Sequence, residues 1–74
     1  MSEKIFVLKA DDEYIELNQL LKLMQFVQSG GHGKLVIEDG LVIVNGEVES
    51  RKRKKMRDGD VAEMDGQKIR VQKA

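Results

Sequence analysis

The sequence predicts an α+β fold in which two packed helices lie against a small, mostly antiparallel sheet of about four to five strands. Three observations predict it: a short apolar run near the start, apolar residues at helical spacing after it, and two glycine turns flanked by strand-forming residues. The 74 residues form one domain, residues 1–74. They include no cysteine, so no disulfide or thiolate metal site is available.

The first half predicts a strand and then a helix. Residues 5–8 (Ile-Phe-Val-Leu) are bounded by charge, which indicates a strand that is covered on both faces or lies at a sheet edge. From Ile15 onward, apolar residues recur every three or four positions, which predicts an amphipathic helix that ends near Gln28. We expect the acids at residues 11–13 to complement the positive end of its dipole.

A second, shorter helix is predicted over residues 32–39. Ser29 can cap its start, and Gly40 can adopt the left-handed conformation that ends a helix. Because residues 35–37 are three branched apolar residues in a row, a strand remains the alternative.

Two hairpins follow. Asn-Gly at residues 45–46 favours a type I′ turn, since both positions take positive φ, and Asp-Gly at residues 65–66 predicts a second tight turn. We expect residues 61–64 to pair with residues 67–71 across the second turn. This register gives one charged pair that faces water and one apolar pair that faces the core: Glu63 with Lys68, and Ala62 with Ile69.

Residues 51–57, here called the basic run, read Arg-Lys-Arg-Lys-Lys-Met-Arg and join the two hairpins. The formal net charge is zero, yet residues 1–50 hold four basic and nine acidic residues while residues 51–74 hold nine and four. The simplest interpretation of the basic run is a solvated loop without a binding role. Six cations in seven positions favour binding to a polyanion instead, and nucleic acid is the commonest such partner.

The positions of the aromatic residues indicate which kind of nucleic acid the basic run binds. None of Phe6, Tyr14 and Phe26 lies in or beside the basic run along the sequence. Proteins that bind unpaired bases usually stack them on aromatic rings, so we expect recognition of structured RNA through its backbone and shape. We expect Phe26 to belong to the core and Tyr14 to pack at the start of the first helix.

A family resemblance rests on the order and spacing of Ser29, Lys34–Ile37, Gly40, Val44-Asn45-Gly46 and Gly59-Asp60-Val61. With these residues the chain resembles the S-four RNA-binding domain, the αL-type module named after the fourth protein of the small ribosomal subunit. The resemblance covers about residues 15–71 and is nearest to stand-alone bacterial members. It implies an αL-type fold, with an RNA-binding surface formed by the two helices and the loop after the hairpin. Two sites depart from the pattern: Gly30 and Gly33 replace a common arginine and alanine, and Asp58 replaces a common proline.

The candidate RNA contacts combine the basic run with the start of the second helix, where free amides favour anions. Arginine can fork onto phosphate oxygens, whereas lysine acts as a point charge. Lys34 could instead be an exposed lysine that does not contact RNA, and His32 could be a loop residue without a role. We expect Asn45 to form the turn rather than to contact RNA. The candidates are Arg51, Lys52, Arg53, Lys54, Lys55, Arg57, Lys34, His32 and Ser29.

The function expected from these residues is non-catalytic binding of structured RNA, with ribosomal RNA or an assembling ribosomal particle as first candidate. No catalytic constellation, metal site or cofactor motif is recognisable, so we expect no enzyme and no cofactor. The alternative is a protein-interaction module whose basic segment docks an acidic partner in a ribosomal or RNA-processing complex. We expect a cytoplasmic monomer and no membrane attachment, since no apolar face or lipidation motif accompanies the basic run.

Overall fold

The structure is a computed structural model that describes residues 2–74. A five-stranded sheet has the strand order β1-β7-β6-β3-β4, and β2 pairs with β5 in a separate two-stranded ladder. Within the larger sheet, β1 runs parallel to β7 and the other neighbouring pairs are antiparallel. In chain order the elements are β1 (Ser2–Leu8), β2 (Ile15–Glu16), α1 (Leu17–Leu23), α2 (Gly30–Glu38), β3 (Ile43–Val44), β4 (Glu47–Val48), β5 (Lys55–Met56), β6 (Val61–Met64) and β7 (Gln67–Lys73).

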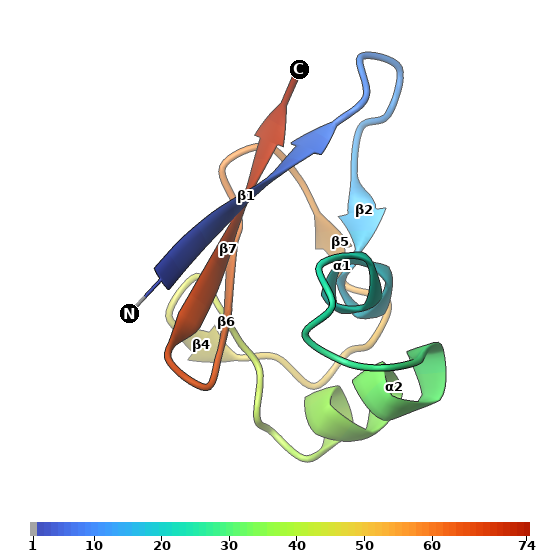
Figure 1. Ribbon diagram of the computed structural model, residues 1–74, viewed down its shortest axis with the longest axis vertical. Coiled ribbons are helices and arrows are strands. Elements are labelled where there is room, and N and C mark those ends of the chain that lie inside the picture. The colour runs from blue at the N-terminus through green and yellow to red at the C-terminus, as the bar shows by residue number, and fades with distance from the viewer. Residues whose placement is uncertain (1) are drawn as a thin grey trace.

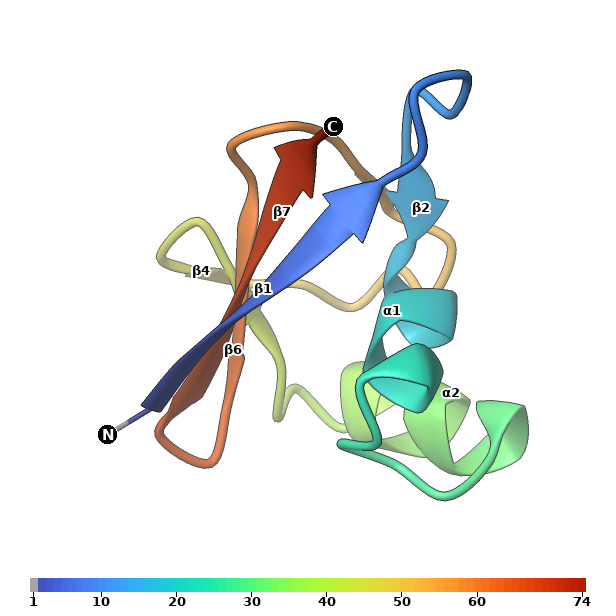
Figure 2. The ribbon, with the colours of Figure 1, turned by 45° about the horizontal axis from the view of Figure 1, so that its top comes forward.

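Both helices lie on the same side of the five-stranded sheet (Figures 1 and 2). Figure 1 views α1 almost along its axis and α2 from the side, so the two helices cross. The core fills the space between sheet and helices, and it combines residues from nearly every element. Its largest fully buried side chains are Leu8, Leu17, Leu20, Leu21, Ile37, Met56, Ile69, Val42 and Val71. The predicted α+β fold of two helices against a mostly antiparallel sheet is therefore confirmed.

Both predicted hairpins are present. Asn45 and Gly46 have φ of 52° and 86°, and Asp65 and Gly66 have φ of 54° and 75°, as type I′ turns require. The second hairpin has the predicted register. Its charged pair lies 4.0 Å apart between Lys68 Nζ and Glu63 Oε1, whereas its apolar pair is buried. The strand predicted over residues 5–8 is also confirmed, and of its two alternatives the edge position is the correct one, because β1 lies at the edge of the sheet.

The first helix is shorter than predicted. It starts at Leu17 because Ile15 and Glu16 are taken into β2, and it ends at Leu23. Gln25 adopts the left-handed conformation, with φ of 62°, and the amide of Phe26 donates to the carbonyl of Leu21. This closes the helix in a Schellman motif, well before Gln28. The acids at residues 11–13 lie in a loop outside the first turn of α1, so the dipole role predicted for them is wrong.

The second helix is confirmed, and the strand alternative for residues 35–37 is excluded. It begins at Gly30, two residues before the predicted start, because the Ser29 Oγ accepts a hydrogen bond of 3.1 Å from the amide of His32. Gly40 has φ of 77° and the amide of Leu41 donates to the carbonyl of Val36, so α2 also ends in a Schellman motif. No helix within residues 2–74 is long and apolar enough to cross a membrane.

Candidate nucleic-acid interface

The basic run is built into the fold: a turn at residues 52–53, closed by a hydrogen bond of 3.1 Å from the amide of Lys54 to the carbonyl of Arg51, leads into β5. Its side chains alternate in exposure: Arg51, Arg53, Lys55 and Arg57 are exposed, whereas Lys52 and Lys54 are half-buried and Met56 is fully buried. Four of the six cations are therefore exposed to solvent.

Hydrogen bonds to α1 hold the basic run in place. The amides of Leu17 and Asn18 donate to the carbonyls of Lys54 (2.9 Å) and Lys52 (3.0 Å). These amides belong to the first turn of α1, where no helical acceptor is available, and Glu16 supplies no side-chain cap. The run thus caps the helix with its own backbone. Figure 1 shows this yellow to orange segment passing from β4 to β5 beside α1.

The basic run joins the two hairpins and also contributes to the core, so the interpretation as a solvated loop is wrong for part of it. Residues 55–56 form β5, which pairs with β2 in the register Ile15 with Met56 and Glu16 with Lys55. Met56 has an exposed fraction of 0%. Because Met56 is buried and the carbonyls of Lys52 and Lys54 are bonded to α1, the backbone that carries the six cations is held in place.

Five of these cations line one open hollow on the surface. Its volume is about 560 Å³, and all of its lining side chains are cationic: Arg51, Arg53, Lys54, Lys55 and Arg57. We call it the basic hollow. Concentrating like charges around one concavity raises the local positive potential and favours an anionic ligand.

Two arginines of the basic hollow already have carboxylate partners. Arg51 forks onto Glu49, with Nε to Oε2 at 2.9 Å and Nη2 to Oε1 at 3.1 Å. This bond lowers the pKa of the Glu49 carboxyl from its ordinary value of 4.5 and raises the pKa of Arg51. Arg53 Nε lies 3.4 Å from Glu16 Oε2. Within residues 2–74, the other four cations of the run have no carboxylate within 4.0 Å: Lys52, Lys54, Lys55 and Arg57.

The start of α2 adjoins the same region through Asn18. Gly33 is buried against α1, where a Cβ would lie 3.6 Å from the carbonyl oxygen of Asn18 and 3.3 Å from Val27 Cγ2. Since Asn18 also donates its amide to Lys52, the first turn of α1 contacts both candidate regions. Lys34 is exposed on α2.

Ser29 and His32 also have structural roles. The Ser29 oxygen caps α2, as predicted, and His32 Nδ1 accepts a hydrogen bond of 3.3 Å from the amide of Gln28. His32 is exposed. The contacts predicted between RNA and these two residues and Lys34 remain predictions.

Tyr14 is the residue that the sequence interpretation missed. Its ring lies 5.1 Å from Lys55 Nζ and 5.6 Å from Arg57 Cζ, and the residue is 40% exposed. It precedes β2 rather than packing at the start of a helix, so an aromatic ring does lie beside the basic run in space. Phe26, in contrast, packs against the core as predicted.

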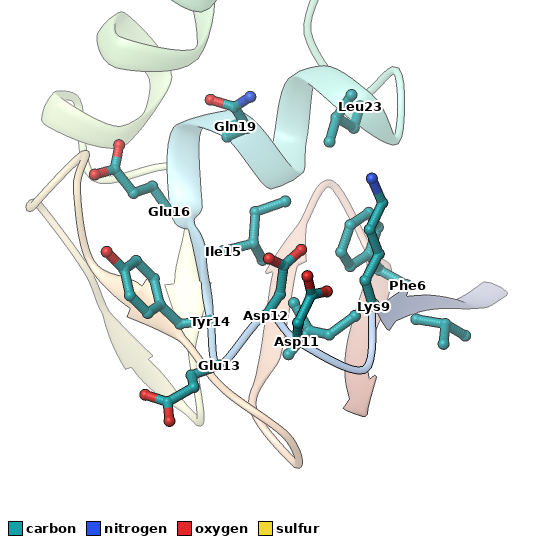
Figure 3. Close-up of a pocket in the computed structure, with 12 residues that line it drawn as sticks. Phe6, Lys9, Asp11, Asp12, Glu13, Tyr14, Ile15, Glu16, Gln19 and Leu23 are labelled. Carbon is teal, nitrogen blue, oxygen red and sulfur yellow. The ribbon is translucent and has the colours of Figure 1, made fainter. Parts of the chain in front are cut away.

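A second hollow, of about 940 Å³, lies between β1, the following loop and α1. Its lining includes the half-buried Phe6 and Ile15, and Figure 3 shows Asp11 and Asp12 close together on the loop before β2. Four of its lining side chains are carboxylates: Asp11, Asp12, Glu13 and Glu16. This acidic hollow disfavours phosphate. It adjoins the basic hollow, because Tyr14 lines it and also contacts Lys55 and Arg57, and because its Glu16 lies 3.4 Å from Arg53.

Asn45 and Asp58 have structural partners. Asn45 Nδ2 donates to Asp60 Oδ1 (3.1 Å), and Asn45 Oδ1 accepts from the amide of Val61 (3.0 Å). Asp58 Oδ1 accepts from the amide of Lys73 at 2.9 Å, so the departure from proline adds a bond between this turn and β7. Among residues 2–74, no group of three or more histidine, aspartate or glutamate side chains could hold a metal ion.

Comparison with known proteins decides the family. A sequence model of the S4 domain matches residues 8–72. The chain belongs to the S4 domain family. The match extends the predicted resemblance over residues 15–71 toward both ends, and it includes β2, α1, α2 and the whole basic run of this S4 domain.

Two bacterial proteins are similar in sequence to this S4 domain. The probable ribosome maturation protein RlbA of Bacillus subtilis (strain 168) is 43% identical over 56 residues, which are 76% of this chain and 79% of the relative. The putative RNA-binding protein YbcJ of Escherichia coli (strain K12) is 40% identical over 58 residues, or 78% of this chain and 83% of that one.

The solution structure of E. coli YbcJ has the same fold. It superposes with a TM-score of 0.69 at 37% identity and covers 92% of this chain and 85% of YbcJ. It is described as revealing an αL motif involved in RNA-binding. The αL fold implied by the sequence is therefore confirmed for this chain.

Proposed function

We propose that this S4 domain is a non-catalytic RNA-binding protein that recognises structured RNA through the basic hollow. The observation that carries the proposal is the all-cationic lining of that hollow on a segment held by α1 and β2. Phosphates bound there release condensed counterions, which is the main source of affinity for a basic protein surface. Because the backbone that carries these cations is already held by α1 and β2, binding need not order it.

The cations that we propose to contact RNA are those that are exposed or that line the basic hollow. Arg51, Arg53, Lys55 and Arg57 are exposed, and Lys54 lines the hollow from a half-buried position. Lys52 contributes mainly to the positive electrostatic potential around the hollow. The start of α2 would extend the surface, with Lys34 and His32 exposed and Ser29 capping the helix whose amides face a phosphate.

The target class that we propose is ribosomal RNA, or RNA in an assembling ribosomal particle. Its support is the description of the Bacillus subtilis relative as a probable ribosome maturation protein. The description of E. coli YbcJ as a putative RNA-binding protein supports the coarser assignment. Ribosomal or RNA-processing proteins are the corresponding protein partners.

The acidic hollow gives the domain a single binding orientation. Its carboxylates repel phosphates, whereas the basic hollow attracts them. An RNA that approaches the domain is therefore steered to one face.

The test compares two variants with the same change in charge. Lys54→Gln with Arg57→Gln removes two cations from the basic hollow. Lys68→Gln with Arg70→Gln removes one lysine and one arginine from β7, where the buried Ile69 between them indicates that both face away from the helices. Binding to a structured ribosomal RNA fragment is measured across a salt series.

We expect only the hollow variant to lose affinity, with its salt slope reduced by about 1.5 because two phosphate contacts are lost. Equal losses in the two variants would mean that net charge, not the hollow, binds RNA. Binding to a protein from a nuclease-treated extract, lost in the hollow variant while RNA binding is absent, would favour the protein-interaction alternative.

A further inference from the structure

The exposed ring of Tyr14 lies among cations of the basic run. It contacts Lys55 and Arg57 through cation–π interactions at 5.1 and 5.6 Å. Neither cation has a carboxylate within 4.0 Å in residues 2–74. An aromatic face beside unpaired cations is the combination with which proteins hold unpaired nucleotides.

The position of the ring follows from the β2–β5 ladder. Ile15 pairs with Met56 and Glu16 with Lys55, so the next step of the register places Tyr14 opposite Arg57. Side chains alternate along an extended chain. Figure 3 accordingly shows Tyr14 and Glu16 on one side of the chain and Ile15 on the other, toward the core. The ring is therefore held next to a paired segment.

We propose that Tyr14 is a stacking platform for one unpaired base, beside the phosphates that the basic run binds. This inference rests on the proposed function and narrows its target to structured RNA with an unpaired nucleotide, as in a bulge, a loop or a junction. A base that stacks on the ring displaces a cation–π contact, which is weak at an exposed site. The displaced cation then becomes free to pair with the flanking phosphate.

The first experiment uses two substitutions and two RNAs. Tyr14→Phe keeps the ring, whereas Tyr14→Leu keeps apolar volume and removes the ring. The RNAs are one hairpin with a single unpaired purine in its stem and the same hairpin without that nucleotide. Both stems are closed by the same non-nucleotide linker, so the second hairpin has no unpaired base. Circular dichroism and thermal melts check that both variants remain folded.

We expect Tyr14→Leu to bind the hairpin with the unpaired purine roughly five- to a hundredfold more weakly than the parent chain. We expect Tyr14→Phe to bind it like the parent chain, and all three proteins to bind the fully paired hairpin equally. A loss of affinity for only the hairpin with the unpaired purine would indicate stacking. If the ring only positioned Lys55 and Arg57, affinity for both hairpins would fall.

Intrinsic fluorescence supplies a second readout, because Tyr14 is the only tyrosine and the chain has no tryptophan. Stacking predicts stronger quenching of its emission by the hairpin with the unpaired purine than by the paired hairpin at equal saturation.

Three outcomes would overturn the proposal. An equal loss for both RNAs in Tyr14→Leu would show that the ring only positions the cations. Unchanged binding in Tyr14→Leu, with the parent chain binding both RNAs, would reject stacking and leave the proposed function intact. Failure of the parent chain to bind either RNA would reject the proposed function and this inference with it.

Discussion

The main-chain carbonyl of Lys52 accepts a hydrogen bond of 3.0 Å from the amide of Asn18, in the first turn of α1. The bond satisfies a helical amide that has no partner within its own helix. It also fixes the chain that carries the cations relative to the helix. The side chains that we propose bind RNA and the contacts that stabilise the fold therefore lie in one segment. The backbone carbonyls and Met56 stabilise the fold, whereas the exposed cations can be substituted without removing those contacts.

Met56 tests the structural part of this account. Its side chain is fully buried, so we expect Met56→Ala to lower the free energy of unfolding by about 2–5 kcal/mol. Leu35→Ala is the matched control, because Leu35 is 58% exposed and its loss leaves no cavity. Urea unfolding measures both. A similar small effect for the two substitutions would show that the basic run is not packed into the core.

Asn45 and Gly46 should be important for stability and not for RNA binding. Replacing both with alanine adds a Cβ at the positive φ of Gly46, replaces at residue 45 an asparagine that tolerates positive φ better than alanine, and removes the bonds from Asn45 to Asp60 and Val61. We therefore expect a loss of about 2 kcal/mol or more. Asn45→Gly keeps the turn and removes only the side-chain bonds, and it should cost less. A thermal melt unchanged by the double substitution would contradict the hairpin.

Gly30 offers a stabilising substitution. It lies in α2 without positive φ, and a Cβ added there would have no neighbouring atom within 4 Å, so we expect Gly30→Ala to stabilise the domain by about 0.5–1 kcal/mol. Gly33→Ala should gain less, since its Cβ would lie 3.3 Å from the buried Val27. Denaturant midpoints that rank Gly33→Ala above Gly30→Ala would contradict the close packing of Gly33 against Val27.

Glu49 should make stability depend on pH. Its folded-state pKa is lowered by the bond from Arg51, so this pair contributes stability above the ordinary pKa of 4.5 and loses it as pH falls through the lowered value. We expect Glu49→Gln to weaken the fall in melting temperature below pH 4.5, with Glu63→Gln as a control of equal charge. Parallel pH profiles for the parent chain and Glu49→Gln would reject this role.

The same substitution should strengthen RNA binding. Glu49→Gln removes a negative charge bonded to Arg51, which lines the basic hollow, and frees that guanidinium for phosphate. We expect a higher affinity for structured RNA at low salt, whereas Glu63→Gln on β6 should change it less. An affinity lowered by Glu49→Gln would mean that the bond to Glu49 holds Arg51 in its binding position.

The sequence predicts those parts of the fold that depend on local chemistry. The turns at Asn45 and Asp65, the cap at Ser29 and the helix end at Gly40 each rest on residues suited to one backbone conformation, and all are confirmed. The end of α1 was missed because Gln25 adopts positive φ without the glycine that would mark it.

The β2–β5 ladder was missed for a different reason. It joins two segments that are distant in sequence and has only two paired residues on each strand. Met56 is the single apolar residue of the basic run, and it was the available signal that this segment has a buried face. Without the ladder, the approach of Tyr14 to Lys55 and Arg57 could not be predicted from its position in the sequence.

The most direct test of the central claim is a salt titration of binding to a structured ribosomal RNA fragment, with duplex DNA of equal length as competitor. If the basic hollow binds RNA phosphates, log affinity falls linearly with log salt with a slope between about −3 and −5, for four to six contacts, and RNA is preferred. Weak binding with a shallow slope and no preference for RNA would contradict the account.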